Sequence, residues 1–101
     1  MLYFHQLPVV DMVVRELEFR GIRIEHLGMY FEELGAKQVT DNFPYIYVAE
    51  TWRGQILSEE EISFTSSFKV NTVKVRFCAN DDQALNELIK NYRYKTTRIG
   101  G

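Results

Sequence analysis

The clearest alternation of hydrophobic and polar positions lies between residues 62 and 77. Apolar side chains share one parity over residues 62–70, with Ser66 as the exception, and the other parity over 73–77, which is typical of half-buried strands. The parity of the alternation changes at Asn71-Thr72, so we expect a turn or a β-bulge there. The pattern therefore predicts two strand segments in this region.

An amphipathic helix is predicted directly after these strands. Asn80 is the expected N-cap, and Gln83 is placed to return a hydrogen bond to it in a capping box. Apolar residues then recur with the period of one helix face. This face consists of Leu85, Leu88, Ile89 and Tyr92. The following residues, 93–101, are predicted to form a short final strand.

The first third of the chain is predicted to hold a short strand over residues 1–6 and then two helices. In residues 9–20 one helix face would carry Val13 and Leu17, and Gly21 would end the helix. Residues 24–34 repeat the helical pattern, and Gly35 ends it. We favour two helices over the alternative, which is a turn through residues 21–23 followed by one short helix.

The middle of the chain predicts loops and strands. Residues 37–42 are polar and indicate a loop, in which Val39 could start a short strand. Residues 43–52 are rich in strand-favouring types and predict a strand. Arg53-Gly54 is the expected turn into a returning strand over residues 55–57. Residues 58–61 then predict an acidic loop or a single helical turn.

The order of these elements predicts an α+β fold in one domain over residues 1–101. We expect helices on one face of a mainly antiparallel sheet, with a ferredoxin-like split βαβ arrangement as the more specific option. This architecture hosts many unrelated functions, so function has to be argued from individual residues.

Composition narrows the classes of function. The formal net charge of −2 argues against a general nucleic-acid binder, which normally carries a basic excess, but leaves nucleic acid open as a partner. A single cysteine, Cys78, permits no intramolecular disulfide and fits a reducing compartment. The opening residues show no signal-peptide pattern, and no apolar run is long enough to span a membrane. We therefore expect a cytoplasmic protein that does not bind membranes.

The sequence offers few groups for catalysis or metal binding. His5 and His26 are isolated, and neither lies in a recognised ligand spacing with cysteine or acidic residues. Cys78 precedes the helix at Asn80, where a thiol could be activated, but two aspartates in the first turn oppose that effect. We predict no catalytic residue, no metal and no cofactor, and favour a non-enzymatic role; an enzyme that acts through Cys78 or His26 is the remaining alternative.

Aromatic residues make up 14% of the chain, which favours an interface. Tyr45, Tyr47 and Trp52 are the candidate binding residues. If the two tyrosines face outward, Ile46 and Val48 face the core. The main functional hypothesis is a small regulatory or binding protein with another protein as its partner, and self-association into a homodimer is a further expectation.

A second candidate surface surrounds the end of the last helix. Tyr92, Arg93 and Tyr94 interleave aromatic rings and positive charge, the combination expected of a single-stranded nucleic-acid binder. Nucleic-acid binding is a weaker alternative, because basic residues are also common at the C-terminal ends of helices.

The chain ends in Arg98-Ile99-Gly100-Gly101. This diglycine end resembles that of ubiquitin-like modifiers and sulfur-carrier proteins. The resemblance implies that the Gly101 carboxylate is adenylated and converted to a thioester or thiocarboxylate, with both glycines entering a narrow channel of the activating enzyme. Those families open with a β-hairpin before their main helix, whereas this chain is predicted to open with helical segments. A carrier that uses the Gly-Gly end is the alternative function.

Overall fold

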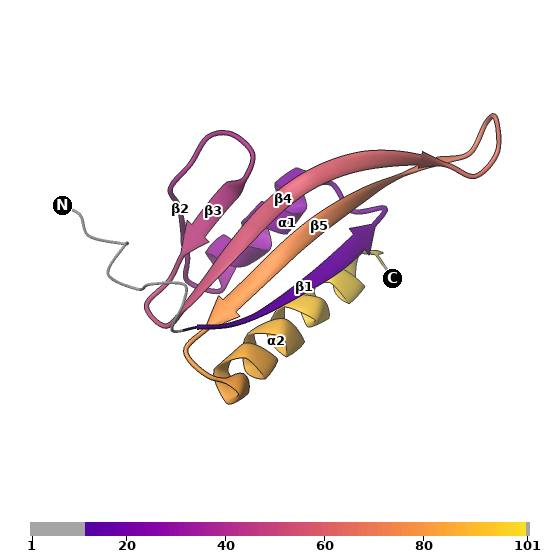
Figure 1. The fold of residues 1–101 in the computed structure, drawn as a ribbon. Coiled ribbons are helices and arrows are strands. Elements are labelled where there is room, and N and C mark those ends of the chain that lie inside the picture. The colour runs from indigo at the N-terminus through magenta and orange to yellow at the C-terminus, as the bar shows by residue number, and fades with distance from the viewer. Residues whose placement is uncertain (1–11, 101) are drawn as a thin grey trace.

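The computed structural model describes residues 12–100 of the chain (Figure 1). The elements are β1 (Val13–Arg20), α1 (Ile24–Glu33), β2 (Lys37–Gln38), β3 (Tyr45–Val48), β4 (Trp52–Ser63), β5 (Lys69–Ala79) and α2 (Asp82–Gly100). The strand predicted over residues 1–6 lies outside the described residues. No helix in residues 12–100 is long and apolar enough to cross a membrane.

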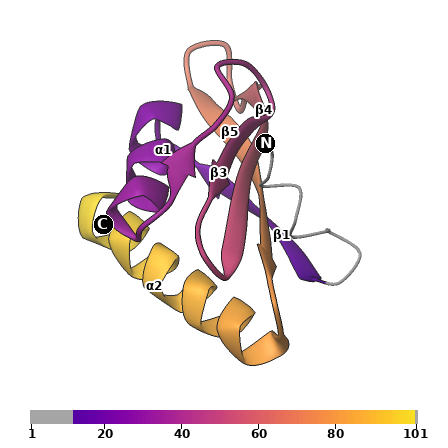
Figure 2. The same cartoon turned by 90° about the vertical axis from the view of Figure 1, so that its left-hand side faces the viewer.

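The described strands form one sheet in the order β1-β5-β4-β3-β2, and all neighbouring strands are antiparallel. Figure 2 shows α1 and α2 on the same face of this sheet. The predicted α+β class, with helices on one face of an antiparallel sheet, is confirmed.

α1 leads from β1 to β2 at the opposite edge of the sheet, and β3 and β4 follow. β1 and β4 are both antiparallel to β5, which lies between them, so β1 and β4 run parallel to each other. Because β2 and β3 come between α1 and β4 in the chain, the ferredoxin-like split βαβ arrangement stays a prediction. The predicted final strand over residues 93–101 is wrong, because α2 continues to Gly100. Thr96 is buried one helical turn after Tyr92, so the buried face of α2 extends beyond the predicted stripe.

The helix predicted over residues 9–20 is also wrong, since residues 13–20 form β1. Val13, Leu17 and Phe19 lie on the side of β1 that packs against the core, with the period of two expected of a strand. Pairing with β5 along the whole of β1 outweighs the helical spacing of the same residues. Gly21, with φ of +76°, turns the chain towards α1, as in the alternative with one short helix.

The helix predicted over residues 24–34 is confirmed as α1. Gly35 follows it with φ of +113°, a conformation that favours glycine and ends the helix. The Ala36 N–H donates to the Phe31 carbonyl oxygen at 3.1 Å, which satisfies one of the last carbonyls of the helix.

The turn predicted at Arg53-Gly54 lies a few residues earlier. The Ala49 N–H donates to the Trp52 carbonyl oxygen at 3.0 Å and closes the β3–β4 turn there. Arg53 and Gly54 lie inside β4, and the acidic residues 58–61 belong to the same strand rather than to a loop. Gly54 is needed for packing, because the ring of Phe31 occupies the space that its Cβ would fill.

β4 and β5 form a long hairpin whose tip projects beyond the rest of the sheet (Figure 1). The tip is closed by the Phe64 N–H, which donates to the Phe68 carbonyl oxygen at 2.8 Å. β5 runs unbroken through Asn71 and Thr72, so the turn or bulge predicted there is wrong. The irregularity lies in β4, whose register shifts between Ile56 and Ser58, opposite Val75 and Lys74 of β5.

The predicted apolar face of α2 is confirmed, but its N-cap is one residue later than expected. Leu85, Leu88, Ile89 and Tyr92 are all buried. The Asp81 carboxylate, rather than Asn80, accepts a hydrogen bond from the Ala84 N–H at 2.8 Å. The Asp81 carbonyl oxygen also accepts the N–H of Leu85. Asp81 therefore satisfies one free N–H of the first turn and places a negative charge at the positive end of the helix.

The core lies where both helices meet the sheet. Phe31 of α1 and Tyr92 of α2 are fully buried, with ring centroids 4.5 Å apart. The Tyr92 hydroxyl donates to the Leu27 carbonyl oxygen at 2.6 Å and thereby ties the two helices together. Phe77 of β5 contacts both rings. An aromatic cluster thus fixes the position of each helix on the sheet.

We predict that Asp81→Ala lowers the free energy of unfolding by about 0.5–2 kcal/mol, because it removes the N-cap. Asn80→Ala, one residue away and exposed, is the matched control and should change stability by less than about 0.5 kcal/mol. Leu88→Ala should be the most damaging, at about 2–5 kcal/mol, because it leaves a cavity under α2. Urea unfolding of the three variants tests this ranking, and a larger loss in Asn80→Ala than in Asp81→Ala would contradict the assigned cap.

Candidate functional site

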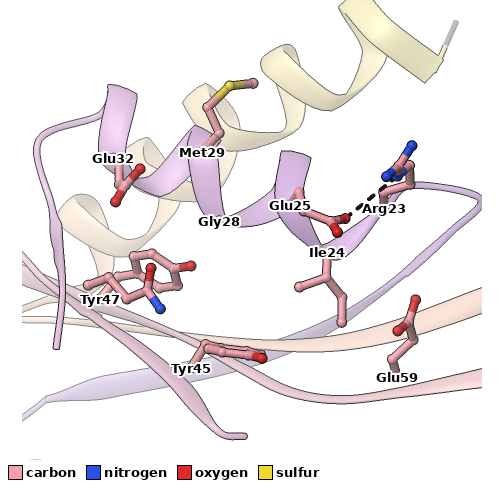
Figure 3. A pocket seen from close by; sticks show the side chains of 10 residues that line it. Arg23, Ile24, Glu25, Gly28, Met29, Glu32, Tyr45, Tyr47 and Glu59 are labelled. Carbon is pink, nitrogen blue, oxygen red and sulfur yellow. Dashed lines mark ion pairs between the residues drawn. The ribbon is translucent and has the colours of Figure 1, made fainter. Parts of the chain in front are cut away.

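A groove of about 550 Å³ runs between α1 and the edge of the sheet (Figure 3). One wall comes from α1 and the residue before it, and the floor comes from β3. The side chains central to it are Glu25, Met29, Glu32, Tyr45, Tyr47 and Glu59. Its volume lies within the range of pockets that bind ligands, and it is open to solvent along its length.

Tyr47 forms the deepest part of the floor and is only 5% exposed. Its ring stacks on Phe31 with centroids 5.2 Å apart, and its hydroxyl lies beneath Gly28, where a Cβ would collide with it. The hydroxyl makes no hydrogen bond within residues 12–100. Burial raises the pKa of Tyr47, and the negative charge of Glu32 raises it further. The groove thus contains a neutral phenol whose ring is buried and whose hydroxyl makes no hydrogen bond to the described residues.

Tyr45 is half-buried and lies beside Tyr47 on the floor of the groove (Figure 3). Its ring packs edge-on against Phe43 at 4.8 Å. The expectation that Ile46 and Val48 face the core while both tyrosines face outward is wrong, because Tyr47 belongs to the core and packs on Phe31. The tyrosines do share one face, and the groove lies over that face.

The charges along the groove are unbalanced. Arg23 pairs with Glu25 at 3.6 Å. Two effects lower the pKa of the Glu25 carboxyl. The larger is the hydrogen bond from its own backbone N–H, and the second is the positive charge of Arg23. Glu59 accepts a hydrogen bond from the Asn71 side chain at 3.0 Å. Within the described residues, neither Glu32 nor Glu59 forms an ion pair, so the groove carries an excess of negative charge.

The remaining predicted binding residues are separate from this groove. Trp52 is half-buried, packs on Phe31 at 5.8 Å and lines a smaller hollow beside α2. Tyr92 is a core residue, and burial raises its pKa well above the usual value, so its predicted place on a binding surface is wrong. Arg93 and Tyr94 are exposed on α2, Tyr94 by 65%.

The basic and aromatic surface predicted at the end of α2 has fewer exposed rings and fewer unpaired charges than expected. Tyr92 contributes no exposed ring, and Lys95 makes an ion pair with Glu33 of α1 at 2.8 Å. A strip of stacked aromatic rings, which single-stranded nucleic acid needs, is not formed by Tyr92 and Tyr94 together.

Gly100 is the last residue of α2, and Gly101 lies outside the described residues. The described part of the predicted carrier end, Gly100, is therefore a helix terminus rather than part of a strand. Thr96 of α2 is buried, and Thr97, which follows it, is exposed.

The thiol and imidazole groups show no arrangement for chemistry in the described chain. Cys78 is fully buried, and this burial raises its pKa, although Arg76 and Arg53 oppose the shift. His26 is partly buried on α1, and His5 lies outside the described residues. No group of three or more potential metal ligands occurs within residues 12–100.

The two tyrosines of the groove were predicted from the sequence as binding residues, but the other residues that line the groove were not. Gly28 lies inside a predicted helix, where glycine lowers helix stability by about 1 kcal/mol relative to alanine. Such a glycine often marks the close approach of another segment, which here is the Tyr47 side chain. Glu32 and Glu59 come from distant elements, so their spacing held no signal. Phe64 and Phe68, exposed at the hairpin tip by 52% and 56%, were assigned to a half-buried strand.

The fold and this site define a small α+β protein with two helices on one face of an antiparallel sheet. A family model described as "Archaeal MoaD-like protein" matches residues 15–101, and the chain belongs to this family. No curated protein and no solved structure matches the chain.

We predict that Gly28→Ala destabilises the protein by about 1 kcal/mol, because the clash with the Tyr47 hydroxyl outweighs the gain in helix propensity. In a Tyr47→Phe background the clashing oxygen is absent, so the same change should cost less. A double-mutant cycle by urea unfolding measures this coupling. Equal costs in both backgrounds would show that the hydroxyl does not lie beneath Gly28.

We predict that native Cys78 reacts with iodoacetamide far more slowly than the same residue in urea. The reactive species is the thiolate, and burial both shields the sulfur and raises its pKa, so the native thiol stays protonated at pH 8. Labelling followed by intact mass across a pH series measures the rate. Equal rates with and without urea would contradict the buried position.

Proposed function

We propose that this protein is a carrier of the ubiquitin-like or sulfur-carrier type, which acts through the carboxylate of Gly101. The observation that supports this proposal is membership of a MoaD-like family over residues 15–101, a match that includes the Gly-Gly end. The predicted helical opening, which argued against the resemblance, is replaced by a strand, β1, before the first helix. The proposal requires a free carboxylate on Gly101.

The chemistry follows from the carboxylate alone. One carboxylate oxygen attacks the α-phosphorus of ATP, and pyrophosphate leaves as the acyl adenylate forms. A sulfur nucleophile then attacks the carbonyl carbon, AMP leaves, and Gly101 becomes a thiocarboxylate or a thioester. Because ATP is required, the proposal retains the cytoplasmic location expected from the sequence.

The tail, residues 97–101, has to leave α2 before it can enter an activating enzyme. The last turn of a helix lacks partners for its carbonyls, and Gly100 is a poor helix former, so unwinding this turn is inexpensive. Five residues in extended conformation span about 17 Å. Buried Thr96 would anchor the rest of α2 while the tail extends.

A non-covalent protein-binding role is the second candidate. The observation that favours it is the open groove over Tyr45 and Tyr47, which are two of the residues selected from the sequence as interface residues. This role needs no free terminus. Self-association and the identity of the protein partner remain predictions.

ATP–pyrophosphate exchange in the presence of an adenylating enzyme of the ubiquitin-activating class tests the carrier role. We expect exchange with the full chain, followed by a mass increase equal to the replacement of one oxygen by sulfur once a sulfur donor is added. Deletion of Gly101 should abolish both signals.

Two controls separate chemistry from folding. The Gly101 deletion should unfold at the same temperature as the full chain, because it removes one terminal glycine, which has no side chain to bury. Gly35→Ala, a change at a glycine far along the chain from the tail, should lower stability without affecting exchange at temperatures where the variant is folded. Exchange that survives the Gly101 deletion would refute the carrier role and leave the binding role.

A further inference from the structure

We propose that the groove between α1 and β3 binds a basic, extended segment of a partner protein, with lysine or arginine side chains against Tyr45 and Tyr47. This inference deepens the binding role proposed for the groove and does not depend on the chemistry of Gly101.

The charges of the groove determine the sign of its ligand. Arg23 is paired with Glu25, whereas Glu32 of α1 and Glu59 of β4 have no ion-pair partner in the described part of the chain. Figure 3 shows these two carboxylates towards opposite ends of the groove. An anionic ligand would be repelled along its length, and a cationic one would meet a carboxylate at either end.

The spread of the carboxylates favours a peptide over a metal ion. Glu25, Glu32 and Glu59 do not converge, and the described residues contain no group of three that could hold a metal. A chain with basic side chains at separate positions can reach both ends at once. A compact cation cannot do this.

The floor of the groove suits the stem of a basic side chain. Tyr45, which is half-buried, offers ring surface to the methylene groups and to the cation of lysine or arginine. The Tyr47 hydroxyl is at the bottom, in a residue that is 95% buried, and accepts no hydrogen bond from residues 12–100. A ligand in the groove can therefore exchange a hydrogen bond with this hydroxyl.

Titration of ¹⁵N-labelled protein with the blocked peptide acetyl-Ala-Lys-Ala-Lys-Ala-amide tests the proposal. Peptides with glutamine or glutamate in place of lysine are the matched ligands. We expect chemical-shift changes at the amides of Gly28, Gln38, Tyr45 and Tyr47 with the lysine peptide only, and we expect them to weaken as salt is added.

Three variants that each remove one negative charge sharpen the test. Glu32→Gln and Glu59→Gln should each raise the dissociation constant about two- to fivefold, as expected for one exposed ion pair. Glu87→Gln, exposed on α2 and outside the groove, changes the net charge equally and should leave the dissociation constant unchanged.

The outcomes are distinct. Equal binding of the lysine and glutamine peptides in the groove would overturn the proposed basic ligand and leave the binding role of the groove intact. Equal weakening by Glu87→Gln would show attraction to net charge and overturn the groove as the site. If none of the three peptides causes shifts, both the basic ligand and the binding role of the groove are overturned. The exchange assay on Gly101 is not affected by this outcome.

Discussion

The packing of the Phe31 ring on the backbone of Gly54 is the contact on which the arrangement of this molecule depends. A Cβ at residue 54 would lie inside the ring, so only glycine lets α1 approach β4 this closely. Tyr92 then packs on Phe31 from α2, and Tyr47 stacks on it from β3. One ring thus positions both helices and the floor of the groove, and close packing leaves none of them free to shift alone.

Local periodicity determined which elements could be predicted. α1 and the buried face of α2 were predicted because one face of each carries apolar residues at helical spacing. β1 was not predicted as a strand, because the spacing of Val13 and Leu17 is compatible with both a helix and a strand. Only the pairing of β1 with β5 decides between the two. Gly54 was assigned to a turn because a sequence does not reveal that a distant ring requires it.

The candidate site was predictable to a smaller extent. Aromatic type was enough to select Tyr45 and Tyr47, but the face of β3 that is buried depends on Phe31, which lies far away in the sequence. The groove is assembled from segments separated by long stretches of chain, so its charge excess appears only after folding. Diglycine at the end of the chain was visible at once, whereas the continuation of α2 to Gly100 was not, because the buried Thr96 lies beyond the apolar stripe that the sequence showed.

The projecting part of the β4–β5 hairpin has a consequence for how the molecule opens. Beyond Glu60 of β4 and Thr72 of β5, the two arms pair only with each other among the described strands, and they end in the exposed rings of Phe64 and Phe68. A two-stranded ribbon without a third strand is marginally stable in water. The arm therefore behaves as a separate foldon, whose amides exchange through local fraying while those of residues 73–79 exchange only when the whole sheet unfolds.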